Sequence, residues 1–252
     1  MTTLGFIGTG NLAGFLVEGL SRARAPYDIM VSPRNAARAR DLNERFGVRI
    51  ARDNQHVIDA CDLVLVSVLP QDSKSVLSRL NYRAGQTILS AMAGVSLELL
   101  HELVAPADAA VSMMPGLANA LNVGPSALYP DNGPAFDLLS QLGPVHVYDT
   151  QQAFTAASVM GAFSGMSTLM MRDAMAWFAA NGLTEDDARR LVAETLKGNA
   201  TMLLETELTM DEVARGVVTP GGITEQGRKV LDAGGSWAAA LDSVHKRISG
   251  TN

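Results

Sequence analysis

The chain has 252 residues, a formal net charge of −6, 47% hydrophobic residues and 18% charged residues, which is the composition of an ordinary folded enzyme. The acidic balance argues against a nucleic-acid partner, because phosphate binding needs clustered cations. A single cysteine, Cys61, excludes an intrachain disulfide and a CxxC metal site, and the 4 histidines lack metal-ligand spacing. We therefore expect no metal site, and we expect Cys61 to be a core thiol.

The first half of the chain alternates short apolar runs with helical patterns. The apolar runs predict strands, and the segments between them carry the 3.6-residue periodicity of helices that cover a sheet. Parallel βαβ units and a doubly wound sheet of the Rossmann type are therefore expected over residues 1–150. The predicted strands are Leu4–Ile7, Asp28–Ser32, Val48–Ala51, Leu63–Val68, Thr87–Ser90 and Ala109–Met113, and the predicted helices are Asn11–Arg24, Ala36–Phe46 and Ser96–Val104.

From about residue 150 the strand patterns stop, so residues 151–252 are expected to form an all-helical domain. Thr150–Met171 has no charged residue but is rich in Gln, Thr, Ser, Gly and Ala. A helix buried between subunits fits this composition better than a membrane span does. Met1–Leu20 lacks a basic leader, so we expect no signal peptide and a cytoplasmic location. The predicted helices are Gln151–Asn181, Glu185–Glu205, Met210–Gly216 and Ser236–Ile248.

A glycine turn follows the first predicted strand. The run Gly8-Thr9-Gly10-Asn11-Leu12-Ala13 fits the pattern G-x-G-x-x-G/A. In that pattern the first glycine permits a tight turn, the second lets the backbone approach a pyrophosphate, and the third position packs the helix on the sheet. The strand before it and the helix after it supply the required context, so the turn predicts a dinucleotide site.

The end of the second strand indicates which dinucleotide is bound. Folds that prefer NAD place an acidic residue there to bind the ribose 2′-hydroxyl, whereas this chain has Ser32, followed by Arg34 and Asn35. A hydroxyl and a guanidinium suit a 2′-phosphate, so NADPH is the expected cofactor.

A second glycine-rich segment lies near the far end of the chain. Val218–Thr224 places Gly221 and Gly222 between a proline and a threonine, within an otherwise helical region. Exposed backbone N–H groups beside a hydroxyl suit a small carboxylate. Together the two glycine segments predict a reductase of a small acid.

These segments resemble the Δ1-pyrroline-5-carboxylate reductase family over essentially the whole chain. The carriers are Gly8–Ala13, Val66–Gln71, Ser90–Gly94, Met114-Pro115 and Val218–Thr224. The resemblance implies an NADPH-dependent reductase of a cyclic imine acid in proline biosynthesis. It also implies a homodimer, or a higher oligomer, whose helices interlock to complete the substrate pocket.

The resemblance implies a role for individual residues. Both implied catalytic residues lie in the second half: Thr155 matches a threonine near the imine nitrogen, and Glu207 matches an acidic residue near the substrate ring, either a proton source or an electrostatic partner of an iminium. Gly221, Gly222, Ile223 and Thr224 would bind the substrate carboxylate. The positions expected around the cofactor are Gly8, Gly10, Asn11, Leu12, Ser32, Arg34, Asn35, Val68, Pro70, Ala93 and Gly94.

The chain departs from the family at the pocket wall. Where the family carries Ser-Gly-Ser-Gly-Pro-Ala-Tyr, this chain has Ser158–Ser164, which is more apolar and more helical. Two alternatives therefore stay open. One is a hydroxy-acid or keto-acid dehydrogenase that uses Lys197, and the other is a regulatory protein that binds NADP without catalysis.

Overall fold

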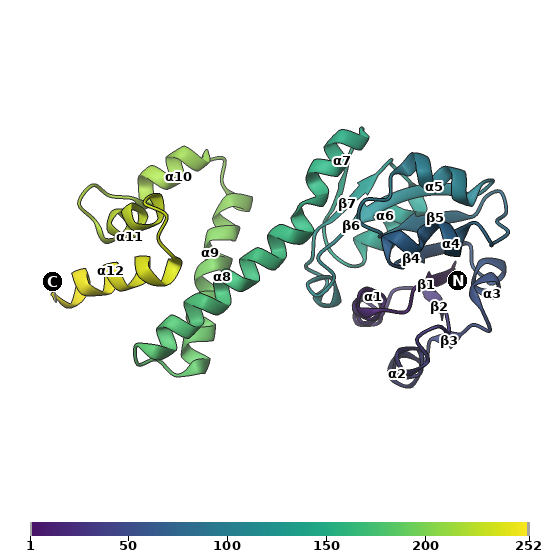
Figure 1. The fold of residues 1–252 in the computed structure, drawn as a ribbon, viewed down its shortest axis with the longest axis horizontal. Helices are drawn as coiled ribbons and strands as arrows, with labels where there is room; N and C mark the ends of the chain where they lie inside the picture. The colour runs from purple at the N-terminus through teal and green to yellow at the C-terminus, as the bar shows by residue number, and fades with distance from the viewer. Residues whose placement is uncertain (1, 251–252) are drawn as a thin grey trace. The chain divides into compact units, whose positions relative to one another are not determined.

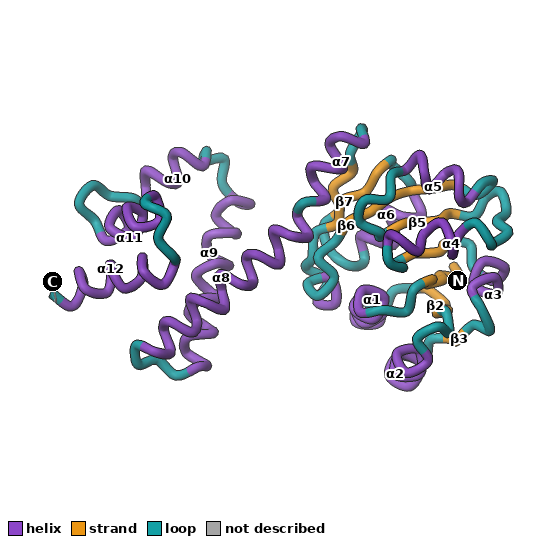
Figure 2. Tube along the Cα trace, viewed as in Figure 1, coloured by secondary structure: helices purple, strands orange, loops and turns teal. Residues whose placement is uncertain are grey.

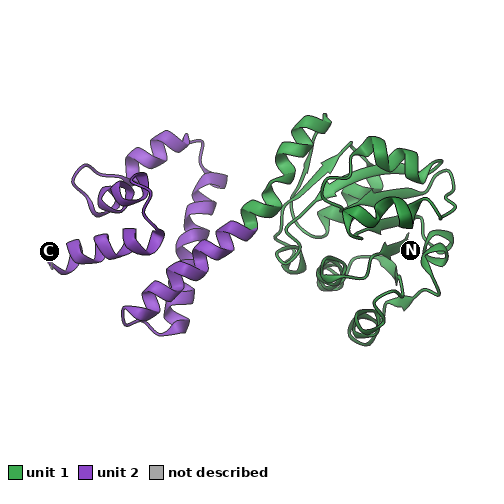
Figure 3. Cartoon of the chain, viewed as in Figure 1, with its two compact units in different colours: residues 1–164 green, residues 165–252 purple. Residues whose placement is uncertain are grey.

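The computed structural model describes residues 2–250, which form two compact units that meet between Ser164 and Gly165 (Figure 3). The boundary predicted at residue 150 stays a prediction. The first unit contains eight strands and the second is helical throughout its described part, as Figure 2 shows. An N-terminal doubly wound sheet followed by a helical region is therefore confirmed.

The first unit is built on one eight-stranded sheet with the order β3-β2-β1-β4-β5-β6-β7-β8. Figure 1 labels strands β1 to β7 of this sheet. Strands β1 to β6 pair in parallel, β7 runs antiparallel to β6, and β8 is parallel to β7. The strands are β1 (Thr2–Ile7), β2 (Tyr27–Val31), β3 (Arg49–Ile50), β4 (Leu63–Val66), β5 (Thr87–Ser90), β6 (Asp108–Met113), β7 (Ser126–Tyr129) and β8 (Val145–Val147).

Helices cover both faces of this sheet. One buried cluster joins the sheet to α1, α2 and α6, and a second joins it to α3, α4, α5 and α7. Strand order reverses between β1 and β4, and in open parallel sheets a crevice for ligands forms at the carboxyl ends of such strands. The helices are α1 (Asn11–Arg22), α2 (Ala36–Phe46), α3 (Asn54–Ala60), α4 (Ser73–Leu77), α5 (Leu97–Val104), α6 (Gly133–Ser140) and α7 (Gln151–Ser158), with the short 3-10 helices η1 (Pro70–Asp72) and η2 (Asn119–Leu121).

The second unit begins within α8 (Met160–Ala180) and contains α9 (Glu185–Glu205), α10 (Met210–Val217), α11 (Ile223–Asp232) and α12 (Trp237–Ser249). Few of its described hydrophobic side chains are buried, namely those of Ala188, Val192, Val213 and Ala240. A hydrogen bond from the Trp177 indole N–H to an Asp242 carboxylate oxygen, at 2.7 Å, joins α8 to α12.

The long helix expected over Gln151–Asn181 is divided into α7 and α8 at Val159. The Ser158 hydroxyl donates to the Phe154 carbonyl oxygen at 2.8 Å, and such back-bonding of serine often bends a helix. The Gln151–Ala180 run is the candidate membrane span found among the described residues, and 6% of its most apolar window is buried within the single chain.

Candidate functional site

The glycine turn after β1 has the geometry that its two glycines predict. Gly8 has φ +100°, and a Cβ added there would lie 2.6 Å from the carbonyl carbon of Ser67. Only glycine fits such a position without strain. A Cβ added to Gly10 would instead meet no atom within 4 Å. The backbone at Gly10 therefore faces open space, into which a ligand can approach closely.

The amino end of α1 opens directly behind this turn. Gly10 is its N-cap, and no described side chain caps the helix at this end. The first intrahelical bond runs from the Gly14 N–H to the Gly10 carbonyl oxygen, so the N–H groups of the first turn point outward. Uncapped N–H groups and the positive end of the helix dipole form an anion site. A pyrophosphate fits this cradle.

Ser32 holds the glycine turn rather than facing solvent. It is 1% exposed, its Oγ accepts the Gly8 N–H at 3.1 Å, and it lies 3.1 Å from Oγ1 of Thr9. The Thr9 hydroxyl donates to the Ser32 carbonyl oxygen at 2.6 Å, so Ser32 is the donor to Thr9. A contact between Ser32 and a 2′-phosphate remains a prediction, and it requires one of these bonds to rearrange.

A cavity of about 510 Å³ lies in front of the turn, at the carboxyl ends of β1, β2 and β4. It brings together six of the predicted cofactor residues: Gly8, Gly10, Ser32, Arg34, Asn35 and Val68. Sequence reasoning missed Thr9, Asn54, Ser67, Leu69, Asp72 and Val76, which line the same cavity. Most of these follow β1 or β4, so their position at a strand end was the available signal.

The other predicted cofactor residues lie outside the lining of this cavity. Asn11 and Leu12 contribute to the first turn of α1, and Pro70 opens η1. Gly94, with φ +78°, follows β5 next to Ala93 and lines a separate cavity of about 220 Å³ in the same unit.

Thr155 lies on α7 and lines this second cavity together with Gln151 and Ser112. Its hydroxyl donates to the Gln151 carbonyl oxygen at 2.7 Å and accepts from the Gln151 side-chain amide at 3.3 Å. The Gln151 side-chain oxygen accepts the Leu97 N–H at 3.1 Å. Gln151 therefore links the amino end of α5 to Thr155. In this arrangement the Thr155 hydrogen is donated to the helix backbone, so Oγ1 is placed to accept from a bound molecule.

In the second unit, Gly221 and Gly222 form the turn that opens α11. Gly221 has φ +73°, and Gly222 is an N-cap without a side chain to cap the helix. The Gly221 N–H donates to the Glu225 carboxylate at 2.9 Å, and Glu225 lies 3.4 Å from Nζ of Lys229. These hydrogen bonds, that from Gly221 first, lower the pKa of Glu225. Ile223 and the exposed Thr224 are in the first helical turn, whose N–H groups have no capping side chain.

Glu207, predicted near the substrate ring, lies exposed in the connection between α9 and α10.

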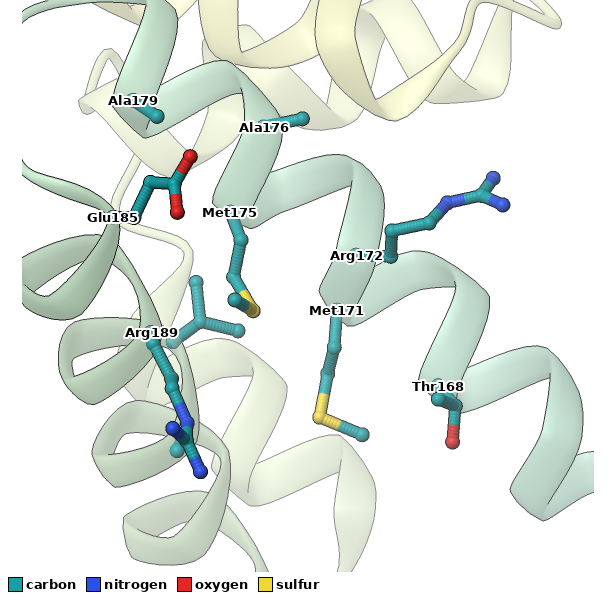
Figure 4. Close-up of a pocket in the computed structure, with 10 residues that line it drawn as sticks. Thr168, Met171, Arg172, Met175, Ala176, Ala179, Glu185 and Arg189 are labelled. Atoms are coloured by element: carbon teal, nitrogen blue, oxygen red, sulfur yellow. The ribbon is translucent and has the colours of Figure 1, made fainter.

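In the second unit α8 and α9 enclose an apolar groove of about 500 Å³. Met171 and Met175 of α8 point into this groove, as Figure 4 shows. Met166 and Leu169, also on α8, are 58% and 52% exposed. Exposed apolar side chains in this number are typical of an interface.

Comparisons with known proteins bear on both ends of the chain. A family model described as "NADP oxidoreductase coenzyme F420-dependent" matches residues 3–94, and one described as "Pyrroline-5-carboxylate reductase dimerisation" matches residues 150–250. A pyrroline-5-carboxylate reductase from Aquifex aeolicus is 29% identical over 96% of this chain and 94% of its own length. A pyrroline-5-carboxylate reductase from Corynebacterium melassecola is 29% identical over 93% of this chain and 92% of its own length. The chain is therefore similar to pyrroline-5-carboxylate reductases over almost its whole length.

Solved structures agree with the fold of this reductase family. A 1-pyrroline-5-carboxylate reductase from Streptococcus pyogenes matches with a TM-score of 0.81 and 22% identity, covering 99% of this chain and 97% of that one. A pyrroline carboxylate reductase from Plasmodium falciparum with NADP bound has the same TM-score at 18% identity and the same coverage. A reductive aminase from Aspergillus terreus in complex with NADPH matches with a TM-score of 0.61 and 16% identity. The match covers 99% of this chain and 94% of that one.

Proposed function

We propose that this protein is an NADPH-dependent reductase of a cyclic imine acid, with Δ1-pyrroline-5-carboxylate as the leading substrate and proline as its product. The observation that carries the proposal is the uncapped amino end of α1 behind Gly8 and Gly10, facing a cavity of about 510 Å³. Similarity to pyrroline-5-carboxylate reductases over almost the whole chain supports a reductase of C=N bonds at this cofactor site.

When bound, NADPH supplies a hydride to the imine carbon. A cyclic imine is readily protonated near neutral pH, so its carbon is already electrophilic and no strong general acid is required. The protein's main task is to hold the two reactants in register, and such positioning supplies a large part of the rate acceleration in many enzymes.

We assign Thr155 to the nitrogen side of the substrate. Its Oγ1 is placed to accept, because its hydrogen is donated to Gln151. An acceptor at this position stabilises the N–H of a protonated imine and does not supply the proton. Water is then the proton source. Glu207 remains a proposed electrostatic partner of the positive ring.

We assign Gly221, Gly222, Ile223 and Thr224 to the substrate carboxylate. The first-turn N–H groups of α11 and the Thr224 hydroxyl are donors for an anion, and the helix dipole adds to their attraction. Around the cofactor we retain all eleven predicted residues, with Arg34 and Asn35 assigned to the 2′-phosphate.

We propose that the working form is a cytoplasmic homodimer. The exposed apolar surface of α8 and the groove that it forms with α9 are the proposed contact. This arrangement accounts for an apolar 30-residue helical run, of which little is buried within one chain, without a membrane.

The decisive experiment is NADPH oxidation at 340 nm with five- and six-membered cyclic imines, each with and without a carboxylate. Turnover that is best with the five-membered imine acid supports the proposal. NADPH binding without oxidation by any of the imines or keto acids would favour a regulatory protein. The Lys197→Ala variant tests the alternative of a dehydrogenase that uses Lys197 as its catalytic lysine. This residue is exposed on α9. Unchanged turnover in this variant excludes it as a catalytic lysine.

A further inference from the structure

An ion pair lies at the cofactor cavity. Nη1 of Arg34, in the connection from β2 to α2, is 3.5 Å from Oδ2 of Asp72, at the end of η1. Both residues line the cavity of about 510 Å³ that contains the glycine turn. The pair therefore connects the loops that follow β2 and β4.

The two partners differ in how firmly they are held. The Arg34 side chain is 75% exposed, whereas that of Asp72 is 32% exposed. Asp72 is anchored by its backbone: its N–H donates to the Leu69 carbonyl oxygen at 2.9 Å, and its carbonyl oxygen accepts the Ser75 hydroxyl at 2.9 Å. The Arg34 guanidinium is thus the more exposed partner, and Asp72 extends from the more firmly held backbone.

The negative charge of Asp72 bears on the choice between NADPH and NADH. Arg34 is the cation expected to bind the 2′-phosphate of NADPH. A carboxylate already paired with that cation competes with the phosphate, and it also repels the phosphate directly. The 2′-hydroxyl of NADH is neutral, so this competition does not affect it.

We infer that Asp72 is a specificity-determining residue that weakens binding of 2′-phosphorylated nucleotides by competing for Arg34. The inference rests on the proposed NADPH site. It predicts that this enzyme discriminates between NADPH and NADH less strongly than its Arg34 alone would allow. Exposed ion pairs contribute modestly, so the expected change on removal of the Asp72 charge is roughly two- to fivefold in affinity.

The test measures binding to the full-length protein by calorimetry, with 2′,5′-ADP and 5′-AMP as probes. Asp72→Asn should tighten 2′,5′-ADP binding, leave 5′-AMP binding unchanged, and show a smaller gain at high salt. In an Arg34→Ala background the same substitution should have a smaller effect, because the competition for the guanidinium is absent. Asp62→Asn is the matched control, since Asp62 pairs with Arg83 and precedes β4, which Asp72 follows.

Weaker binding of 2′,5′-ADP to Asp72→Asn would overturn the inference, because Asp72 would then be orienting Arg34 for the phosphate. An equal change for both probes, or no change, would overturn it as well. Thermal unfolding of each variant shows that the fold is retained. A wild-type protein that binds neither NADPH nor 2′,5′-ADP would instead contradict the proposed function itself.

Discussion

Gly8 and Gly10 lie two positions apart in the same turn, yet an added methyl group meets different surroundings at each. At Gly8 the methyl group would collide with the Ser67 backbone, and the backbone has φ +100°. At Gly10 it would meet no protein atom within 4 Å, and φ is −102°. The first glycine is therefore required by the fold, and we propose that the second leaves room for the ligand.

We expect Gly8→Ala to lower the free energy of unfolding by about 2 to 5 kcal/mol, from left-handed strain and overpacking. Gly10→Ala should unfold like the wild type but bind NADPH about tenfold or more weakly, because its methyl group occupies the approach of the pyrophosphate. Thermal unfolding and calorimetry separate the two effects. A Gly10→Ala protein with normal NADPH affinity would show that the nucleotide does not cross this turn.

Thr155 provides a second prediction at the scale of one side chain. Thr155→Val keeps the shape of the residue and removes the hydroxyl. If Oγ1 accepts a charged N–H, kcat/KM for the imine should fall roughly ten- to hundredfold, with NADPH affinity unchanged. The matched control is Ser140→Ala on α6, which removes another hydroxyl that donates to the helix backbone but lies outside this cavity. Equal losses in both variants would indicate a general effect of removing such a hydroxyl and not an effect on the imine.

Individual elements were predictable where their local signals were strong. Thr184 caps α9 by accepting the Asp187 N–H at 3.1 Å, and both ends of this helix were predicted correctly. Gly47 ends α2 with φ +69°, and both ends of this helix were also predicted correctly. β7 and β8 were missed because they are short and are followed or preceded by prolines. α11 was missed because its pattern starts immediately after the Gly221-Gly222 turn.

The same limit applies to the candidate site. The glycine turn is readable because its residues are contiguous and each has a backbone reason to be there. Asp72 was not readable, because its proximity to Arg34 arises only when β1 places the loops after β2 and β4 at one edge of the sheet. The hydrogen bonds of Ser32 were not readable from the sequence for a related reason: its partners Gly8 and Thr9 lie more than 20 positions away in the sequence.

Substitutions at two neighbouring residues of α11 should change KM in opposite directions. Thr224→Ala removes a proposed donor to the substrate carboxylate, so KM should rise about tenfold. Glu225→Gln keeps an acceptor for the Gly221 N–H but removes a negative charge that the lowered pKa of Glu225 keeps ionised at neutral pH. KM for the carboxylate substrate should therefore fall by about two- to fivefold. A shift of both variants in the same direction would contradict a carboxylate site at this turn.

For the molecule as a whole, the exposed apolar surface of α8 implies that stability depends on association. Burial of α8 by a partner would make unfolding dependent on protein concentration.

The Leu169→Glu substitution places a charge on the exposed surface of α8, where the Leu169 side chain is 52% exposed. Within a single chain such a substitution costs little, but in a closed interface it buries an unpaired carboxylate. We expect the variant to elute as a monomer in size-exclusion chromatography with light scattering, with a lower Tm. Arg40→Glu, exposed on α2 in the first unit, introduces the same residue outside the proposed contact and should remain dimeric. Retention of the wild-type mass by Leu169→Glu would move the interface away from α8.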